Sequence, residues 1–559
     1  MRRRILLACI ALAPALALAA PAGATTAGSA SESPVPVPAS SVPQPGRHLS
    51  SDDVLAIAQA LPRMRRLERE HPGTYDGAYL KGPLRWQVSF FSKRGAKEIG
   101  QVIIADETGR VLEQWTGFQV AWSMARGYPG AFGRHVNALY IWLPLCLLFA
   151  LPFVNPRRPF SMLHLDLLVL LSFSISLAFF NHGEIYQSVP LTYPPLIYLF
   201  GRMLWLTRRR GRPGPPLKLL VPVPWLALGV MFLLGFRIAL NVIDSNVIDV
   251  GYAGVIGAQK IVEDRPLYGG WPSDNEHGDT YGPVTYESYV PFEQVFGWSG
   301  TWDDLPAAHA AAIVFDLLAL GLIFLLGMRI RGPTLGVALA YAWVSYPFTL
   351  FALESNSNDT LVAVCLLGAL LFATSAPLRG AFAALAGFAK LAPLALAPVL
   401  ATHGLRELPP GRARARSLGL FALTFALVSA LALIPALDHD SLARIFNRTI
   451  VYQANRGSPF SVWGLYGSHP LLHGLQTAVQ VGAVLLALAL ALVPRRPDVV
   501  GLAAACGAIL LALQLGVEHW FYLYIPWFFP LVMVALLGAR ALAPAPSPAA
   551  PSEPPARER

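Results

Sequence analysis

Long apolar runs separated by short polar segments fill most of the chain after residue 136. About eleven of these runs approach the ~20 residues that an α-helix needs to cross the hydrocarbon core of a bilayer. The pattern therefore predicts a polytopic, mostly α-helical membrane protein with about eleven transmembrane helices. The runs fall near residues 136–154, 162–180, 190–207, 220–240, 309–328, 334–351, 359–377, 417–437, 471–493, 498–516 and 519–538.

Basic side chains between the runs predict the orientation of the helices, because short cytoplasmic loops carry an excess of Lys and Arg. These groups are Arg157 and Arg158, Arg208–Arg212, Arg329 and Arg331, Arg379, Arg406–Arg416, and Arg495 and Arg496. One further apolar segment, residues 381–402, would export the Arg406–Arg416 group if it crossed the membrane. Since Gly387 and Pro393 interrupt this segment, we predict a re-entrant or broken helix with Lys390 near the bend. The alternative is an ordinary kinked span together with one miscounted helix.

This orientation places the segments richest in polar and aromatic residues on the outer side of the membrane. They are residues 181–189, 241–308, 352–358, 438–470 and 517–519. Loops as long as 241–308 are usually functional or disordered, and its Trp, Tyr and Gly-Pro content favours an ordered, functional loop. The Ala- and Pro-rich tail, residues 539–559, is predicted to be cytoplasmic and disordered.

The first part of the chain differs from the membrane part. Residues 1–24 have the basic start, short apolar run and small-residue end of a secretory signal peptide, with an uncleaved anchor as the alternative. Residues 25–47 form a Ser/Pro/Ala-rich linker. Residues 48–135 are predicted to form a small exported α+β domain, with a helix over 54–70 that Ser51-Asp52-Asp53 caps. Three strands follow at 84–92, 98–105 and 110–115, and the turn 106–109 joins the last two as a hairpin.

Composition agrees with a membrane protein and excludes one class of partner. Hydrophobic residues make up 54% of the chain and charged residues only 14%, whereas soluble domains carry about 25% charged residues. The net charge of +10 comes from basic groups between apolar runs, so we predict no nucleic-acid partner. Cys146, Cys365 and Cys506 lie in apolar runs and Cys9 in the signal peptide, so no disulfide framework or thiolate metal site is indicated.

The first candidate for chemistry is Asp249, directly after the fourth apolar run. A carboxylate beside the membrane surface can act as a general base toward a lipid-borne substrate, and such a group contributes about 10²- to 10⁴-fold to a rate. The alternative is a solvated loop aspartate.

Four motifs in order extend this observation. DVGYAG with RPLY includes Asp249 and Tyr268, YGP begins at Tyr281, ESNSND spans 354–359, and AGFAKLAPLALAPVL contains Lys390. Over about residues 220–540 they resemble the GT-C glycosyltransferases, particularly family 87, a family of membrane enzymes that use polyprenyl-phosphate mannose. Residues 103–117, IIADETGRVLEQWTG, resemble a PepSY domain, which implies a binding or inhibitory role for the exported domain 48–135.

The resemblance implies a GT-C-like transmembrane domain over 136–538 in the plasma membrane, with its active-site loops outside. It implies an inverting hexosyltransferase that moves a mannose-like sugar from a polyprenyl-phosphate donor to an envelope glycan, glycolipid or protein, among membrane lipids. Asp249 matches the position of the catalytic carboxylate. The cations available for the donor phosphate are Arg237, Lys260, Arg265, Lys390, Arg448, Arg456 and His519. The residues expected to contact sugar or acceptor are Tyr252, Tyr268, Tyr281, Asn356, Asn358, Asp359 and Trp463.

Several of these residues have a structural interpretation beside the functional one. Asn358 and Asp359 can cap a helix, Trp463 can belong to the aromatic belt at the membrane interface, and His519 can cap the last span with Glu518. Asp316, inside the fifth run, is expected to form a structural pair.

No cofactor is predicted with certainty. Asp274, Glu276, His277 and Asp279 are weak candidates for a divalent cation that would bridge a lipid phosphate, with a solvated turn as the alternative. Two other functions remain as alternatives to a transferase. One is a transporter or flippase for lipid-linked sugars, and the other is a non-enzymatic membrane sensor that binds a ligand through its exported domain.

Overall fold

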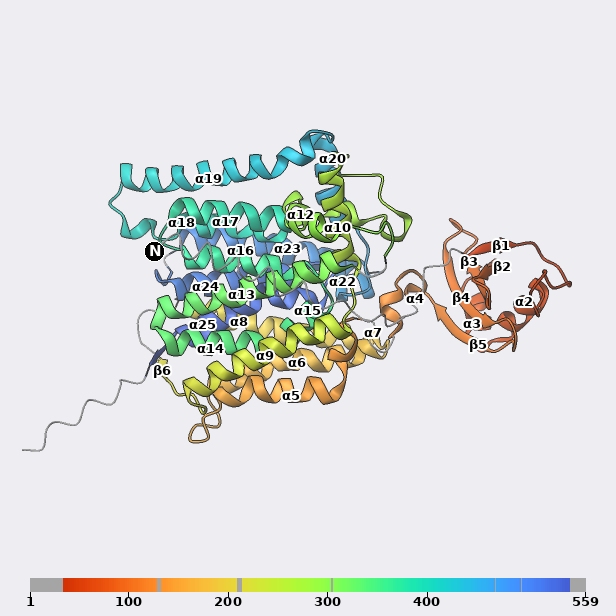
Figure 1. Ribbon diagram of the computed structural model, residues 1–559, viewed down its shortest axis with the longest axis horizontal. Coiled ribbons are helices and arrows are strands. Elements are labelled where there is room, and N and C mark those ends of the chain that lie inside the picture. The colour runs from red at the N-terminus through yellow and green to blue at the C-terminus, as the bar shows by residue number, and fades with distance from the viewer. Residues whose placement is uncertain are drawn as a thin grey trace, which may run out of the picture. The chain divides into compact units, whose positions relative to one another are not determined.

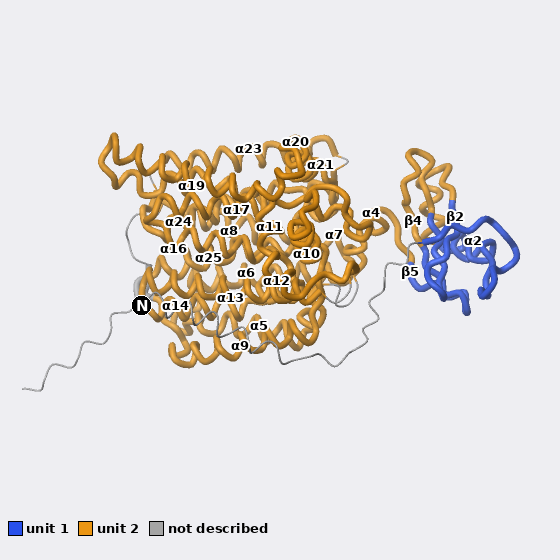
Figure 2. Tube along the Cα trace, turned by 45° about the horizontal axis from the view of Figure 1, so that its top comes forward, with its two compact units in different colours: residues 1–61, 76–89, 102–113 blue, residues 62–75, 90–101, 114–559 orange. Residues whose placement is uncertain are grey.

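The computed structural model describes residues 34–127, 132–208, 214–302, 305–467, 469–493 and 495–542. The predicted signal peptide, the first part of the linker and most of the predicted tail lie outside the described residues. The chain divides into two compact units (Figure 2). One comprises residues 1–61, 76–89 and 102–113, and the other comprises residues 62–75, 90–101 and 114–559.

The N-terminal part contains a five-stranded sheet in which the strands follow their sequence order. The strands are β1 Val35–Val37, β2 Tyr75–Lys81, β3 Arg85–Phe91, β4 Glu98–Ala105 and β5 Val111–Thr116. The last three agree with the predicted strands to within a residue, and the turn between β4 and β5 has Gly109 at a φ of +65°. The pattern did not indicate β1 and β2.

The single predicted helix over 54–70 is two helices, α2 Ser51–Ala60 and α3 Pro62–Glu70. The chain is extended at Leu61 (φ −68°, ψ 132°), because a residue that precedes proline disfavours the helical conformation. The N-cap of α2 is Ser50 rather than Ser51. Its side chain accepts a hydrogen bond from the backbone of Asp53, whose carboxylate binds the backbone N–H of Ser50 in return.

Among the residues that the structure describes, six helices are long and apolar enough to cross a membrane. They are α6 Met162–Asn181, α9 Val223–Asp244, α13 Pro306–Arg331, α19 Arg412–Leu437, α23 Pro470–Leu492 and α24 Val499–Gly516. The pair α14 Pro333–Ser345 and α15 Pro347–Glu354, bent by 56°, makes a seventh span if it is counted as one. The predicted number of about eleven is not reached by full-length helices in the described residues. Shorter apolar helices occupy Leu139–Phe153, Asp359–Leu371, Ala376–Ala389 and Tyr522–Gly538.

The break predicted near Lys390 is present. Helix α17, Ala376–Ala389, ends at Lys390, whose backbone is extended with φ −136° and ψ 141°. A 3₁₀ turn η6, Ala392–Leu396, and the short helix α18, Ala397–Thr402, follow. Pro393 cannot donate the backbone hydrogen bond that a continuing helix would need. Lys390 therefore lies at a non-helical position between two helical segments.

The elements between the long helices gather at one end of the helical bundle (Figure 1). They include α7 Ile185–Leu191, α10 Asp249–Val262, α12 Val290–Phe296, α15, α20 Leu442–Phe446 and α22 Val462–Leu465. The described parts of the predicted loop 241–308 are folded, with α11 Pro283–Glu287 and the 3₁₀ turns η4 Ser273–Asn275 and η5 Gly278–Thr280 besides α10 and α12. The strand β6 Gly214–Leu217, which precedes α9, pairs in parallel with β7 Arg540–Leu542 at the end of the described residues.

Candidate active site

A cavity of about 1460 Å³ lies within the helical unit. It exceeds the ~300–1,000 Å³ of ordinary small-molecule sites, so it has room for more than one small ligand. Titratable and aromatic side chains from segments that are far apart in the sequence form its wall. Those of the predicted site residues that line it are Asp249, Tyr281, Asp359, Lys390, Arg456 and His519.

Asp249 is the first residue of α10, where the helix dipole favours a negative charge. The segment before it is held by backbone hydrogen bonds from Asn246 N–H to the Glu354 carbonyl (3.2 Å) and from Ile248 N–H to the Ser355 carbonyl (3.2 Å). Gly251 lies so close that a Cβ atom there would be 2.1 Å from the Asn356 carbonyl oxygen. The loop at 354–358 thus fixes where α10 begins and where the Asp249 carboxylate points.

Asn356 and Asn358 hold this backbone in place rather than face the cavity. Asn356 has a left-handed backbone (φ +46°), and its side chain amide donates to Ser245 Oγ and to the Asn246 carbonyl, both at 3.0 Å. The Asn358 amide donates to the Val250 carbonyl at 3.1 Å. Both are buried and neither lines the cavity, so the structure does not place them where they were predicted to bind sugar.

Asp359 and Lys390 form a buried ion pair in the cavity wall, with Lys390 Nζ 2.9 Å from Asp359 Oδ1. Trp527 Nε1 donates to the same carboxylate oxygen at 3.0 Å. The Lys390 ammonium also lies 4.8 Å from the centre of the Tyr281 ring. The charge of Lys390 is therefore compensated by its partner, and together the two groups add little net charge to the cavity.

Tyr281 reaches this pair because its neighbour Gly282 packs against the end of α17. A Cβ atom at Gly282 would be 1.9 Å from the Phe388 carbonyl oxygen, a contact that only glycine permits. Thr285 Oγ1 then donates to the Ala389 carbonyl at 2.7 Å. The YGP motif is thus fixed to the segment that ends at Lys390.

Arg456 is the cation in the cavity that remains available to a ligand. Within the described ranges, no carboxylate lies within ion-pair distance of its guanidinium. Its contact is with an aromatic ring, because Arg456 Cζ lies 5.3 Å from the centre of the Trp122 indole. A guanidinium in this state keeps its full charge and its planar set of donors, which match the oxygens of a phosphate.

Asp249 and His519 have shifted proton affinities. The Asp249 side chain is open to the cavity, yet the surrounding protein removes much of its hydration, and this desolvation raises its pKa above the ordinary value. Arg456 and, more weakly, Lys390 act in the opposite direction. Burial holds the pKa of His519 well below its usual value, with Arg456 and Lys390 adding to the effect. His519 is therefore a neutral hydrogen-bonding group at neutral pH, 2.9 Å from Ser458 Oγ, and not the phosphate-binding cation that was predicted.

One wall of the cavity is polar. It is formed by His473, Gln476, Thr477 and Gln480 of α23. These positions lie at i, i+3, i+4 and i+7, on one face of an otherwise apolar helix. Gln476 and Gln480 both donate their amide N–H to the Gly516 carbonyl, at 3.3 and 2.9 Å. The wall offers hydrogen-bonding groups that suit the hydroxyl groups of a sugar.

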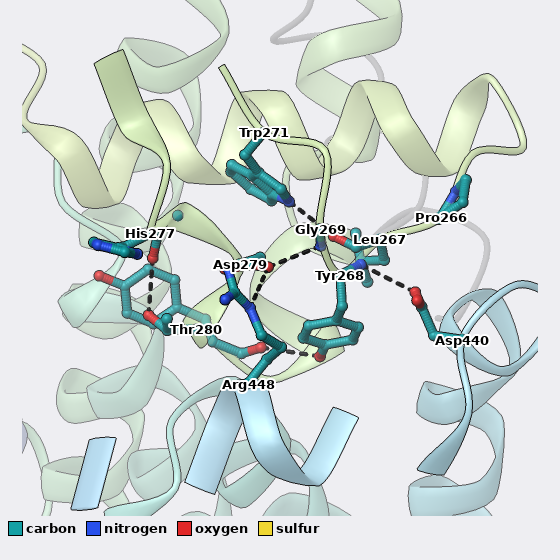
Figure 3. Close-up of polar contacts among 12 residues, drawn as sticks. Pro266, Leu267, Tyr268, Gly269, Trp271, His277, Asp279, Thr280, Asp440 and Arg448 are labelled. Carbon is teal, nitrogen blue, oxygen red and sulfur yellow. Dashed lines mark hydrogen bonds and ion pairs between the residues drawn. The ribbon is translucent and has the colours of Figure 1, made fainter. Parts of the chain in front are cut away.

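Three predicted phosphate ligands contact residues of the loop 241–308 instead, and Figure 3 shows one of them, Arg448. Arg448 Nε donates to Asp279 Oδ2 at 2.6 Å, and the same oxygen accepts the Gly269 N–H at 2.8 Å. Lys260 donates to the carbonyls of Pro266 and Gly269, at 2.9 and 2.7 Å. Arg265 pairs with Glu263 at 2.6 Å, where both side chains are exposed.

Arg237, another predicted phosphate ligand, contacts a carboxylate outside the cavity. It forms a buried pair with Asp316 at 2.6 Å inside the helical bundle, and Trp343 Nε1 donates to the same carboxylate at 2.9 Å. This is the structural pair expected for Asp316. Arg237 therefore serves as the partner of that pair and does not line the cavity.

The remaining predicted sugar ligands also lie outside the cavity wall. Tyr252 is buried against the rings of Trp298 and Trp302, and its hydroxyl donates to Asp274 at 3.3 Å. Tyr268 is buried and donates its hydroxyl to the Tyr281 carbonyl at 3.0 Å (Figure 3). Trp463 donates from its indole to the Leu515 carbonyl at 2.8 Å.

The acidic segment around Asp274–Asp279 is not assembled as a metal site. Among the residues that the structure describes, no group of three or more His, Cys, Asp or Glu side chains is placed to hold a metal ion. Asp279 pairs with Arg448, and the His277 ring packs 5.1 Å from the ring of Tyr452. These residues instead organise the loop.

The sequence patterns did not indicate several residues that line the cavity. Trp122 belongs to the segment that was expected to be part of the exported domain, and no motif marks it. Trp527 and Tyr524 lie in an apolar run that gives no sign of which face is lined. The polar face of α23 could have been found, because its four polar residues recur with helical spacing.

Comparison with known proteins adds one finding. Residues 280–517 match the sequence model of Glycosyltransferase family 87, which supports a membrane glycosyltransferase in general. The matched range contains Tyr281, Asp359, Lys390 and Arg456, whereas Asp249 and Trp122 precede it. No curated protein matches the chain.

Proposed function

We propose that this protein transfers a mannose-like sugar from a polyprenyl-phosphate donor to a cell-envelope acceptor, on the external face of the plasma membrane. The observation that carries the proposal is that the Asp249 carboxylate and the unpaired Arg456 guanidinium line the same cavity. One group can accept a proton and the other can bind a phosphate. Transfer of a sugar from a lipid phosphate to a hydroxyl group needs both.

The reaction is a single displacement. Asp249 takes the proton from the acceptor hydroxyl as its oxygen attacks C1 of the sugar. The bond from C1 to the phosphate oxygen breaks, and its electron pair stays on the departing polyprenyl phosphate. One displacement inverts the configuration at C1. The raised pKa of Asp249 makes the carboxylate a stronger base than an ordinary aspartate, which suits general base catalysis near neutral pH.

The phosphate gains negative charge as the bond breaks, so a cation aimed at it lowers the barrier. Arg456 fits this role because no carboxylate in the described residues pairs with it. Lys390 contributes less than predicted from the sequence, because Asp359 neutralises it at 2.9 Å. We propose that this pair orients Tyr281 and Trp527 at the wall rather than binding the phosphate directly.

The rest of the cavity provides room for the other parts of the substrates. The polar face of α23 suits sugar hydroxyls, and the apolar side chains of Leu433, Leu442 and Ile445 suit an isoprenoid chain. The acceptor is an envelope glycan, glycolipid or protein. The N-terminal α+β part, which resembles a PepSY domain, is proposed to bind a ligand or partner outside the membrane.

The test is transfer of radiolabelled mannose from polyprenyl phosphate in membranes that contain Asp249→Asn or Asp249→Ala. We expect each variant to lose about 10²- to 10⁴-fold in transfer rate, the contribution of a positioned base. Asp264→Asn is the matched control, because Asp264 is exposed and pairs with His439 outside the cavity. Undiminished transfer by both Asp249 variants would overturn the assignment of the base. Movement of the labelled lipid across the membrane without transfer by the wild-type protein would favour the flippase.

A further inference from the structure

We infer that Trp122 is a positioning residue for the phosphate subsite, and that it holds the Arg456 guanidinium in place without neutralising it. The inference rests on the proposed function, because it assumes that Arg456 receives a phosphate. Trp122 precedes the first membrane helix and lies 158 residues before the matched range begins at residue 280. The segment that contains it therefore lies outside the range that the family model matches.

The indole of Trp122 is the centre of a small cluster at the cavity. Arg456 Cζ lies 5.3 Å from the ring centre. The ring of His519 lies 5.7 Å away with an interplanar angle of 31°, and the ring of Phe460 lies 5.3 Å away, edge-on at 82°. Trp122, Arg456 and His519 all line the cavity. The indole thus contacts the one cavity cation that lacks a carboxylate partner among the described residues.

The segment around Trp122 is locked by its own hydrogen bonds. Trp122 lies between the short helix α4, Phe118–Ala121, and the 3₁₀ turn η1, Ser123–Arg126. Its N–H donates to the Phe118 carbonyl at 2.9 Å, and its carbonyl accepts the Ala125 N–H at 2.9 Å. Arg126 Nε donates to the Gln119 carbonyl at 2.8 Å, and the Gln119 amide donates to the Ala125 carbonyl at 3.0 Å. These bonds set the direction of the indole.

The same segment is seated on the helical bundle by close backbone contact. Gly127 has a φ of +70°, and a Cβ atom there would be 2.2 Å from the Gly183 nitrogen, so no larger residue fits. The Phe118 ring packs edge-on against Tyr186 at 5.7 Å, and Ala125 is fully buried. Trp122 is therefore positioned by the loop after α6 rather than by the residues that carry the charge.

A cation–π contact suits this role better than an ion pair would. A carboxylate partner would cancel the charge of Arg456 and occupy its N–H donors. The indole contacts the guanidinium without forming an ion pair with it, so it can restrain the long side chain while the N–H donors remain for phosphate oxygens. The depressed pKa of His519 keeps that neighbouring ring uncharged, so it does not repel Arg456.

The experiment measures binding of farnesyl phosphate, a short polyprenyl phosphate, to the purified full-length protein in detergent. Trp122→Leu is expected to weaken binding about 10-fold, within the range of a desolvated cation–π contact. Trp122→Phe, which keeps an aromatic face, is expected to restore most of the affinity. Arg456→Gln should abolish the effect of Trp122→Leu in the double variant, because the two changes remove one interaction.

Two controls separate positioning from a merely structural role. Trp298→Leu removes an indole that packs on Tyr252 outside the cavity wall and is expected to leave the affinity unchanged. Farnesol, which lacks the phosphate, should bind the Trp122→Leu variant and the wild type equally. Wild-type affinity for farnesyl phosphate in Trp122→Leu, or an equal loss for farnesol, would overturn the inference. A wild-type protein that binds no farnesyl phosphate would instead contradict the proposed function.

Discussion

The ammonium group of Lys390 lies 2.9 Å from a carboxylate oxygen of Asp359, inside the cavity that both residues line. The two residues come from a broken helix and from the first turn of α16, Asp359–Leu371. Both are buried, so each charge depends on the other for compensation. The pair also explains why Lys390 adds little net charge to the cavity. The other two charged groups discussed above are Asp249 and Arg456, and no carboxylate of the described residues pairs with Arg456.

Replacing Lys390 by Met should therefore destabilise the protein, because Asp359 would keep a buried charge without its cation. We expect the free energy of unfolding to fall by about 3–5 kcal/mol, the usual cost of removing one partner of a buried pair. Chemical denaturation in detergent micelles measures this change. The double variant Lys390→Met/Asp359→Asn removes the orphaned charge and should recover much of the loss. Wild-type stability in Lys390→Met would contradict the buried pair.

The pH dependence of transfer should report Asp249. Only the ionised carboxylate can accept a proton, so transfer is expected to rise as the pH rises through its pKa and to be lost below it. Because desolvation raises this pKa, the acid limb of kcat/KM should lie above the ordinary aspartate value of about 3.9. Arg456 acts to lower the same pKa, so Arg456→Gln should move the acid limb to still higher pH. An acid limb that stays in place or moves to lower pH in Arg456→Gln would contradict this coupling, and Asp264→Asn serves as the control.

The pair between Arg448 and Asp279 should act on the order of the segment 269–282 rather than on phosphate binding. Asp279 is fully buried and receives both Arg448 and the Gly269 N–H, so Arg448→Gln weakens the support of the segment 269–282 (Figure 3). We expect faster limited proteolysis within this segment. Affinity for farnesyl phosphate should change by less than it does in Arg456→Gln. A larger loss of phosphate affinity in Arg448→Gln than in Arg456→Gln would show that the wrong arginine has been assigned.

Sequence reasoning located some of the site because the signal is local. Asp249 follows an apolar run directly, and Gly387 and Pro393 around Lys390 mark the helix break that the structure contains. The sequence does not indicate the distant partners that several of the predicted cations have. Arg448 and Asp279 are 169 residues apart in the chain. For pairs so distant, no pattern along the sequence indicates which carboxylate will contact which arginine.

The described residues contain fewer full-length helices than the predicted number of spans, for a different reason. Some apolar runs are long enough to suggest a full crossing but form shorter helices, such as Asp359–Leu371. At Tyr346 the chain is extended before Pro347, which bends the run by 56°. Hydropathy counts apolar residues and does not detect where such a run turns. The glutamines of α23 differ from these runs. Their helical spacing can be read directly from the sequence, although the sequence does not show that they line a cavity.

The bare backbone contact between Gly282 and Phe388 has a mechanical consequence. With no side chain between them, and with Thr285 bound to Ala389 beside them, the loop that provides Tyr281 and the helix end that provides Lys390 form a single rigid piece. A substrate that enters the cavity therefore meets these two segments as one wall. A motion that widens the cavity is expected between this wall and segments outside it, not between Tyr281 and Lys390.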